Sequence, residues 1–144
     1  ILIGMKKFIL LSFIFMFLSS CDENTINNNN PYLPNYTFSV NVDSTLPSND
    51  NLRYPGNGVK ITQSGVGVRG IFVFNTGSGY TAWDAACPNQ TLGNCSNMSL
   101  SGINAQCPCD NKLYSLYTGE SAGMKYPLKQ YRTEINGTII RVYN

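Results

Sequence analysis

The sequence predicts a small all-β domain of antiparallel strands, and three observations lead to that prediction. Apolar and polar residues alternate from residue 36 onward, turn residues cluster between short apolar runs, and no segment keeps a helical period. The 144 residues leave room for one domain behind an N-terminal leader. We therefore expect a β domain over residues 36–144, built from several short sheets or a partial barrel.

The N-terminal segment predicts a secretory signal peptide over residues 1–20, with Met5 as its start. Lys6 and Lys7 supply a positive region, and an apolar stretch follows at residues 8–17. The alternative is a transmembrane anchor, which needs about 20 apolar residues. The apolar run is much shorter than that, so the pattern favours a cleaved signal.

The signal ends in Leu-Ser-Ser-Cys at residues 18–21, which resembles the lipobox of bacterial lipoproteins. In that motif the cysteine is diacylated and becomes the new N-terminus, so the resemblance implies lipidation of Cys21 and attachment to a membrane. Asp22 and Glu23 resemble acidic sorting signals that keep lipoproteins out of the inner membrane. We expect a lipoprotein of the cell envelope, anchored in the outer membrane and facing the periplasm or the surface.

Residues 21–35 predict a disordered tether between the lipid and the domain. The segment is rich in asparagine, contains Pro31 and Pro34, and has almost no apolar side chain to bury. Such a composition cannot offset the entropy lost on ordering.

The first expected strand covers residues 36–42, where Tyr36, Phe38, Val40 and Val42 alternate with polar residues. Further strands are expected at residues 59–61, 71–74 and 80–84, with a turn cluster at residues 75–79 before the last of them, and one short strand-like segment at residues 100–106.

The C-terminal part predicts a β-hairpin. Asn136-Gly137 separates an apolar run that contains Tyr131 and Ile135 from residues 139–143. Asn-Gly between such runs indicates a type I′ turn, which needs positive φ at both central positions.

Composition excludes several classes of function. The chain has no histidine, which excludes a Ser/His/Asp triad, a Cys/His dyad, and zinc or iron held by imidazole. Without Lys6 and Lys7 the ten basic residues fall to eight, which equals the eight acidic ones. A neutral chain has no basic surface for nucleic acid, and no pair of carboxylates suggests acid–base catalysis.

Four cysteines remain for the domain once Cys21 carries lipid, and they lie in two proline-containing loops. The first loop has Cys-Pro-Asn at residues 87–89 and Cys95, and the second has Cys-Pro-Cys-Asp at residues 107–110. This arrangement resembles the Rieske iron–sulfur domain, in which a Cys-x-His loop and a Cys-x-x-His loop bind a [2Fe–2S] cluster. The resemblance covers roughly residues 66–143 and implies a two-loop cysteine tip on a Rieske-like β domain.

The resemblance also assigns roles to the loop residues. It places Cys87 and Cys107 on the cluster cysteines, and Cys95 and Cys109 on the disulfide that braces the loops in some members. Asn89 and Asp110 stand where the family has its two histidines. Since an amide is a poor ligand for thiolate-bridged iron and a carboxylate suits harder sites, the resemblance implies a fold that has lost its redox centre.

Three arrangements of the four cysteines remain open. They can form two disulfides, Cys95–Cys109 and Cys87–Cys107, as an exported chain favours. They can hold zinc or an all-cysteine [2Fe–2S] cluster, although the spacing differs from that of zinc knuckles. Alternatively, one bracing disulfide forms while Cys87 and Cys107 act as a redox dithiol, which needs a lowered thiol pKa.

We expect a non-catalytic accessory or binding subunit at the cell envelope, with no cofactor and no metal. The membrane, through the acyl groups on Cys21, is its expected partner, together with another envelope protein. The alternative function is electron transfer by a [2Fe–2S] centre with a non-standard ligand set.

Overall fold

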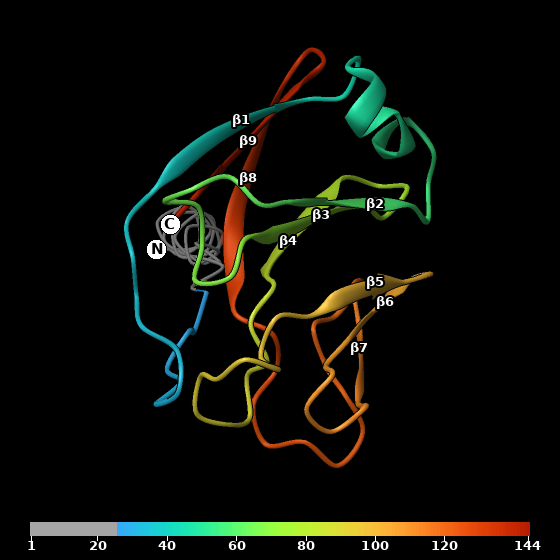
Figure 1. The fold of residues 1–144 in the computed structure, drawn as a ribbon. Coiled ribbons are helices and arrows are strands. Elements are labelled where there is room, and N and C mark those ends of the chain that lie inside the picture. The colour runs from blue at the N-terminus through green and yellow to red at the C-terminus, as the bar shows by residue number, and fades with distance from the viewer. Residues whose placement is uncertain (1–25) are drawn as a thin grey trace, which may run out of the picture.

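The computed structural model describes residues 26–144, which form nine strands and one 3₁₀ helix (Figure 1). The expected signal peptide (residues 1–20) and the expected lipidation site Cys21 lie outside the described residues. In chain order the elements are β1 (Ser39–Asp43), the 3₁₀ helix η2 (Pro47–Arg53), β2 (Gly58–Ile61), β3 (Ile71–Asn75), β4 (Tyr80–Asp84), β5 (Ser99–Ser101), β6 (Asn104–Gln106), β7 (Leu113–Ser115), β8 (Gln130–Asn136) and β9 (Ile139–Tyr143).

The strands form two antiparallel sheets. The larger has six strands in the order β1-β9-β8-β4-β3-β2 and curls into a half-barrel, and the smaller has the order β5-β6-β7. Figure 1 shows the small sheet on the opposite side of β3 and β4 from β1 and β9. This arrangement confirms the predicted all-β, antiparallel fold of several short sheets.

Strand β3, which lies between β4 and the edge strand β2, is buried along its whole length because it separates two apolar cores. Its side chains alternate, so Ile71 and Val73 join the core inside the half-barrel, while Phe72 and Phe74 join the core under the small sheet. Complete burial of one such side chain contributes about 1.5–3 kcal/mol. The second core also contains Trp83, Met98, Tyr114 and Leu116 together with Cys87 and Cys107, so the cysteine loops are part of the packed interior.

The C-terminal hairpin differs from the prediction in its turn. Asn136 pairs with Ile139, so Gly137 and Thr138 are the central residues and Asn136 is the last residue of β8. Gly137 has φ 60° and Thr138 is not among the residues with positive φ. Positive φ at the first central position alone is the type II′ pattern, so the predicted type I′ turn at Asn136-Gly137 is wrong by one residue.

The segment predicted as one strand-like stretch at residues 100–106 is also a hairpin. Ser101 pairs with Asn104, and Gly102 adopts φ 61° at the turn between β5 and β6. Glycine accepts that conformation at no steric cost, so the chain reverses there instead of continuing.

The described part of the expected tether is ordered, which corrects the prediction of disorder for residues 26–35. The Asn28 side chain donates to the Gln130 carbonyl oxygen at 2.7 Å and accepts from the Gln130 N–H at 2.9 Å, as a neighbouring strand would. Asn30 donates to the Pro88 carbonyl oxygen at 2.8 Å, and Leu33 is buried. Hydrogen bonds from asparagine amides therefore attach this segment to the domain, although it has few apolar side chains to bury.

Within residues 26–144, no helix has the length and apolar character needed to span a membrane.

Candidate functional site

Two loops meet at the end of the domain below β4 (Figure 1). The first cysteine loop, residues 85–98, returns on itself through hydrogen bonds from Cys87 N–H to the Ser96 carbonyl at 2.9 Å and from Met98 N–H to the Ala85 carbonyl at 2.8 Å. The second cysteine loop, residues 107–112, joins β6 to β7. It is closed by the Cys107 N–H and the Lys112 carbonyl at 2.9 Å.

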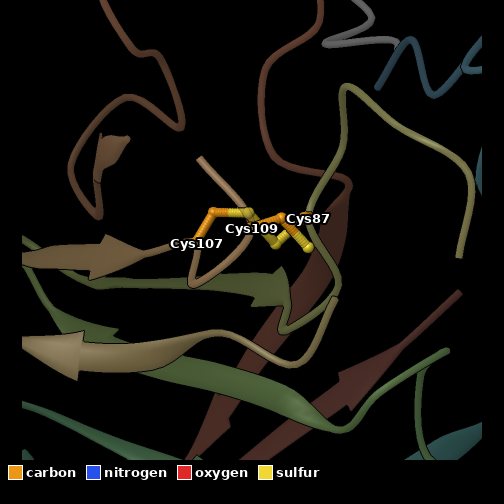
Figure 2. A group of neighbouring side chains, drawn as sticks. All are labelled: Cys87, Cys107 and Cys109. Atoms are coloured by element: carbon orange, nitrogen blue, oxygen red, sulfur yellow. A yellow bond between two sulfur atoms is a disulfide. The ribbon is translucent and has the colours of Figure 1, made fainter. Parts of the chain in front are cut away.

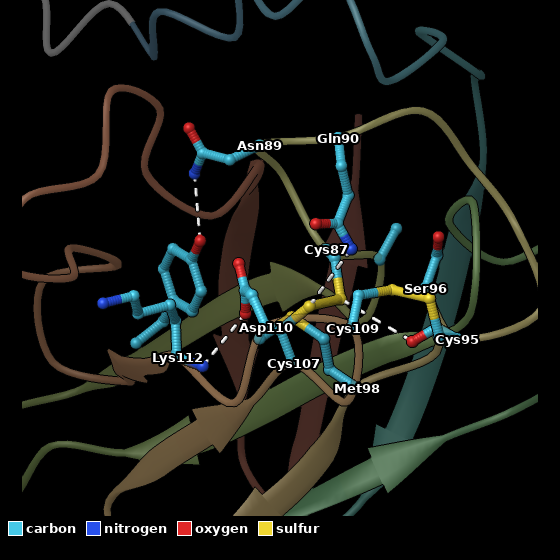
Figure 3. Close-up of a disulfide and its surroundings, with 12 residues drawn as sticks. Cys87, Asn89, Gln90, Cys95, Ser96, Met98, Cys107, Cys109, Asp110 and Lys112 are labelled. Atoms are coloured by element: carbon cyan, nitrogen blue, oxygen red, sulfur yellow. Dashed lines mark hydrogen bonds between the residues drawn. A yellow bond between two sulfur atoms is a disulfide. The ribbon is translucent and has the colours of Figure 1, made fainter.

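Two disulfides join these loops (Figure 3). Cys87 is bonded to Cys107 with their Cα atoms 5.6 Å apart, and Cys95 is bonded to Cys109 with their Cα atoms 5.1 Å apart. These are the pairings of the two-disulfide arrangement, one of the three left open by the sequence; the Rieske resemblance implies only the Cys95–Cys109 bond, since it places Cys87 and Cys107 on the cluster. The first bond is buried, with Cys87 1% and Cys107 0% exposed, whereas Cys95 lies at the surface.

The sulfur atoms of the two disulfides are neighbours. The Sγ atoms of Cys87, Cys107 and Cys109 all lie within 4.8 Å of one another. Figure 2 shows the three side chains grouped together. The Gln90 side chain approaches them from the first loop, with its Nε2 atom 3.6 Å from the Cys107 Sγ. The four cysteines of the domain therefore form one cluster, although they are spread over 23 residues of sequence (87–109).

Asn89 connects the first loop to the chain before β8. Its side-chain amide donates to the Tyr114 hydroxyl at 2.9 Å and to the Tyr126 carbonyl at 2.7 Å, and its oxygen accepts from the Tyr126 N–H at 2.9 Å. Burial raises the pKa of Tyr114, so this hydroxyl stays protonated at neutral pH. Asn89 therefore holds two segments together with both ends of its amide (Figure 3 shows the bond to the tyrosine ring).

Asp110 has a local role in the second loop. Its Oδ1 accepts from the Lys112 N–H at 2.9 Å, which is an Asx turn. Asn111 then adopts φ 60° and closes the loop, with its N–H donating to the Cys107 carbonyl at 2.9 Å.

The side chains at the four Rieske-equivalent positions do not fit a histidine-ligated [2Fe–2S] centre. The two cysteines at the cluster positions are bonded to each other, Asn89 uses its amide in three hydrogen bonds, and the chain has no histidine. The centre needs two thiolates on one iron and two imidazoles on the other.

Asp84 is a site residue that sequence reasoning missed. Its side chain is fully buried at the end of β4 and accepts from Val68 N–H at 2.5 Å, Ala86 N–H at 2.7 Å and the Tyr131 hydroxyl at 2.7 Å. Burial raises the pKa of the Asp84 carboxyl, against the hydrogen bonds that lower it. Because these donors come from three segments, Asp84 positions the start of the first cysteine loop.

Two lysines lie near this carboxylate and hold further segments. Lys60 donates to the Met98 carbonyl at 2.5 Å and to the Asn97 side chain at 2.6 Å, so it anchors the end of the first loop to β2. Lys129 donates to the Asn35 side chain at 2.9 Å. Burial lowers the pKa of both lysines, while the charge of Asp84 acts in the opposite direction.

No protein-family model matches the chain, and no curated protein sequence matches it. Among solved structures, the chain is similar to one in the complex of reduced oxygenase and oxidized ferredoxin of carbazole 1,9a-dioxygenase. That match has 19% identity and a TM-score of 0.50, and it covers 73% of this chain and 92% of the other.

Two ferredoxin structures match less closely. One is the ferredoxin of carbazole 1,9a-dioxygenase from Nocardioides aromaticivorans IC177, with 16% identity and a TM-score of 0.47 over 75% of this chain and 97% of the other. The second is a Sphingomonas yanoikuyae B1 ferredoxin, with 17% identity and a TM-score of 0.45 over 63% of this chain and 88% of the other. The match to the carbazole 1,9a-dioxygenase complex, at 19% identity, concerns the fold alone, and it confirms that the chain has a Rieske-like fold.

Proposed function

We propose that this chain is a cell-envelope lipoprotein whose Rieske-like domain carries two disulfides in place of an iron–sulfur centre. In this proposal the domain is a non-catalytic accessory or binding subunit, and the acyl groups on Cys21 attach it to the outer membrane. The observation that carries the proposal is the bond between Cys87 and Cys107, because it consumes the two thiolates that a Rieske centre requires.

The surrounding contacts support a bracing role for the loops. Asn89 links the first loop to Tyr126, and the second disulfide links the two loops at the surface. A disulfide that closes about 15 residues contributes about 3 kcal/mol to a small domain. The loops are thereby held rigidly, as a surface that binds a partner protein requires.

The first test measures metal and thiols in the full chain, purified in detergent without air. We expect colourless protein without iron, in which Cys87, Cys95, Cys107 and Cys109 resist alkylation until a reductant is added. Brown protein with stoichiometric iron and acid-labile sulfide would overturn the proposal and favour the alternative, an electron carrier with a non-standard ligand set. That alternative has support in the fold shared with a ferredoxin-containing complex.

The second test concerns the membrane anchor. The Cys21→Ser variant should lose its acyl groups and move from the membrane to the soluble fraction, as mass spectrometry of the N-terminal peptide and fractionation would show. An unchanged distribution would contradict lipid anchoring through Cys21. Cys95→Ser is the matched control, because it also removes one sulfur but should leave the chain in the membrane.

The third test concerns the partner. A photo-crosslinking amino acid at Pro108, which is exposed on the second cysteine loop, should give an adduct with another envelope protein. The same amino acid at the exposed Asn51 in η2 provides a control at a different part of the surface. Equal adducts from both positions, or none from Pro108, would contradict a binding surface at the loops.

A further inference from the structure

The sulfur atoms of the two disulfides are close enough together for their reduced forms to be compared with a metal site. The Sγ atoms of Cys87, Cys107 and Cys109 lie within 4.8 Å of one another, and Figure 2 shows these three side chains grouped together. The fourth cysteine, Cys95, is bonded to Cys109. Four thiolates at about 2.3 Å from a tetrahedral zinc ion are about 3.8 Å apart. After reduction the Cys87 and Cys107 sulfurs would have to separate to that distance, and clustered sulfurs farther apart than that would have to approach by at most about 1 Å.

The fold, not the sequence spacing, brings these ligands together. Zinc knuckles place their two cysteines two to four residues apart, whereas the first loop has seven residues between Cys87 and Cys95 and the second has one between Cys107 and Cys109. The two loops face each other with each disulfide crossing between them, so each loop supplies two of the four sulfurs. Backbone hydrogen bonds within each loop hold that loop's own conformation independently of the disulfides.

We infer that the reduced chain binds one zinc ion through the thiolates of Cys87, Cys95, Cys107 and Cys109. The inference goes beyond the proposed function, which concerns the oxidised protein. A dithiol reductant supplies the four electrons and four protons that convert two disulfides into four thiols. Zinc then binds the thiolates, and the thiol protons pass to solvent.

The surroundings favour a structural zinc ion over a catalytic one. Cys87 and Cys107 are buried among the apolar side chains of the second core, and Gln90 Nε2 is close enough to donate to a thiolate at Cys107. All four positions around the ion would be protein sulfur, so none is open to a substrate. Zinc would thus hold the two loops together when the disulfides are absent.

The test uses the full chain in detergent, reduced with a phosphine that does not compete for metal. Zinc is added, the excess is removed, and native mass spectrometry counts the bound ions, while competition with a chromophoric chelator measures the affinity. Cobalt(II) substitution reports thiolate ligands through its charge-transfer absorption. Near-ultraviolet circular dichroism of Trp83 reports whether the loops keep the packing of the oxidised protein.

We expect one zinc ion per reduced chain, none in the oxidised chain, and a near-ultraviolet spectrum like that of the oxidised protein. Each of the variants Cys87→Ser, Cys107→Ser and Cys109→Ser, measured in the reduced state, should bind zinc at least about 100-fold more weakly. Loss of a group that only contacts a metal ligand weakens affinity by up to about 100-fold, and loss of a ligand itself should cost at least as much. Cys21→Ser, which removes a cysteine outside the cluster, should leave the affinity unchanged.

Three results would overturn the inference. The first is reduced protein that binds zinc no more tightly than the Cys87→Ser variant. The second is equal binding by oxidised and reduced protein. The third is zinc binding without recovery of the near-ultraviolet signal, since thiols of an unfolded chain would then account for it. Colour and thiol content are measured before reduction, so failure here is distinguishable from failure of the proposed function.

Discussion

The two disulfides should differ in what their removal costs, because one is buried and the other is at the surface. The perturbation is a pair of double variants, Cys87→Ser with Cys107→Ser, and Cys95→Ser with Cys109→Ser. The sequence separations are 20 and 14 residues, for which loop-closure entropy gives about 3 kcal/mol in each case. The entropic part therefore does not separate the two pairs.

Burial separates them. Cys87 and Cys107 are 1% and 0% exposed, so each serine hydroxyl would enter the second core, whereas Cys95 is exposed. A buried polar group without a partner costs about 1–3 kcal/mol. The buried pair should thus lose about 5–9 kcal/mol, from two hydroxyls and one disulfide, and the surface pair about 3 kcal/mol.

Urea unfolding followed by Trp83 fluorescence measures this difference. With a slope of about 2 kcal/mol per molar urea, the midpoint should fall by about 1.5 M for the surface pair and by about 2.5–4.5 M for the buried pair. Complete unfolding of the buried-pair variant in water would agree with the larger loss, while equal shifts, or a larger shift for the surface pair, would refute the reasoning. Mass spectrometry should find the remaining disulfide intact in both variants.

Three further outcomes are expected. Asn89→Ala removes three hydrogen bonds, two of them to the backbone of Tyr126, and should cost about 1–3 kcal/mol by urea unfolding; no change would mean that the amide does not brace the loops. Burial raises the pKa of Asp84 in the folded protein above its value of 3.8 in the unfolded chain, so the folded protein binds this proton more tightly. The resulting stabilisation is complete below the unfolded-state pKa and is lost as the pH rises through the folded-state pKa. Unfolding midpoints of the native protein should therefore fall relative to those of Asp84→Asn as pH rises above about 4, and parallel pH profiles would contradict the shift. Gly119→Ala would place a Cβ 2.5 Å from the Trp83 ring, at a residue with φ +76°. We expect the free energy of unfolding to fall by at least about 1 kcal/mol and the fluorescence of the single tryptophan to shift to the red. An unshifted spectrum would contradict the close packing of Gly119 against Trp83.

The proposed replacement of an iron–sulfur centre by disulfides has a consistent physical basis in this chain. A cluster and a disulfide pair both hold two loops at a fixed separation, but the disulfides need no imidazole and no bound iron. Asn89 stands at a position where the resemblance expects a histidine, and its amide makes structural hydrogen bonds instead. The site is thereby built for rigidity, which is why we propose a binding surface and not an electron carrier.

The sequence by itself determined the fold class and most strand positions, because burial on one or both faces of a sheet imposes a period of two. The alternation around Val40 and Val42 and the apolar run at residues 71–74 became β1 and β3. The cysteine loops could also be predicted, since a resemblance in loop spacing depends on local sequence. Turn register could not be predicted, because the pairing of Asn136 with Ile139 is set by the whole hairpin.

Only the tertiary structure decided which distant groups meet. Asp84, Val68 and Tyr131 are far apart in sequence, and their contact depends on how β3, β4 and β8 pair. The order of residues 26–35 likewise depends on carbonyl and N–H groups that β8 and the first cysteine loop present to asparagine side chains. Hydrogen bonds of this kind form between polar groups that leave no hydrophobic period in the sequence, so only the assembled fold reveals them.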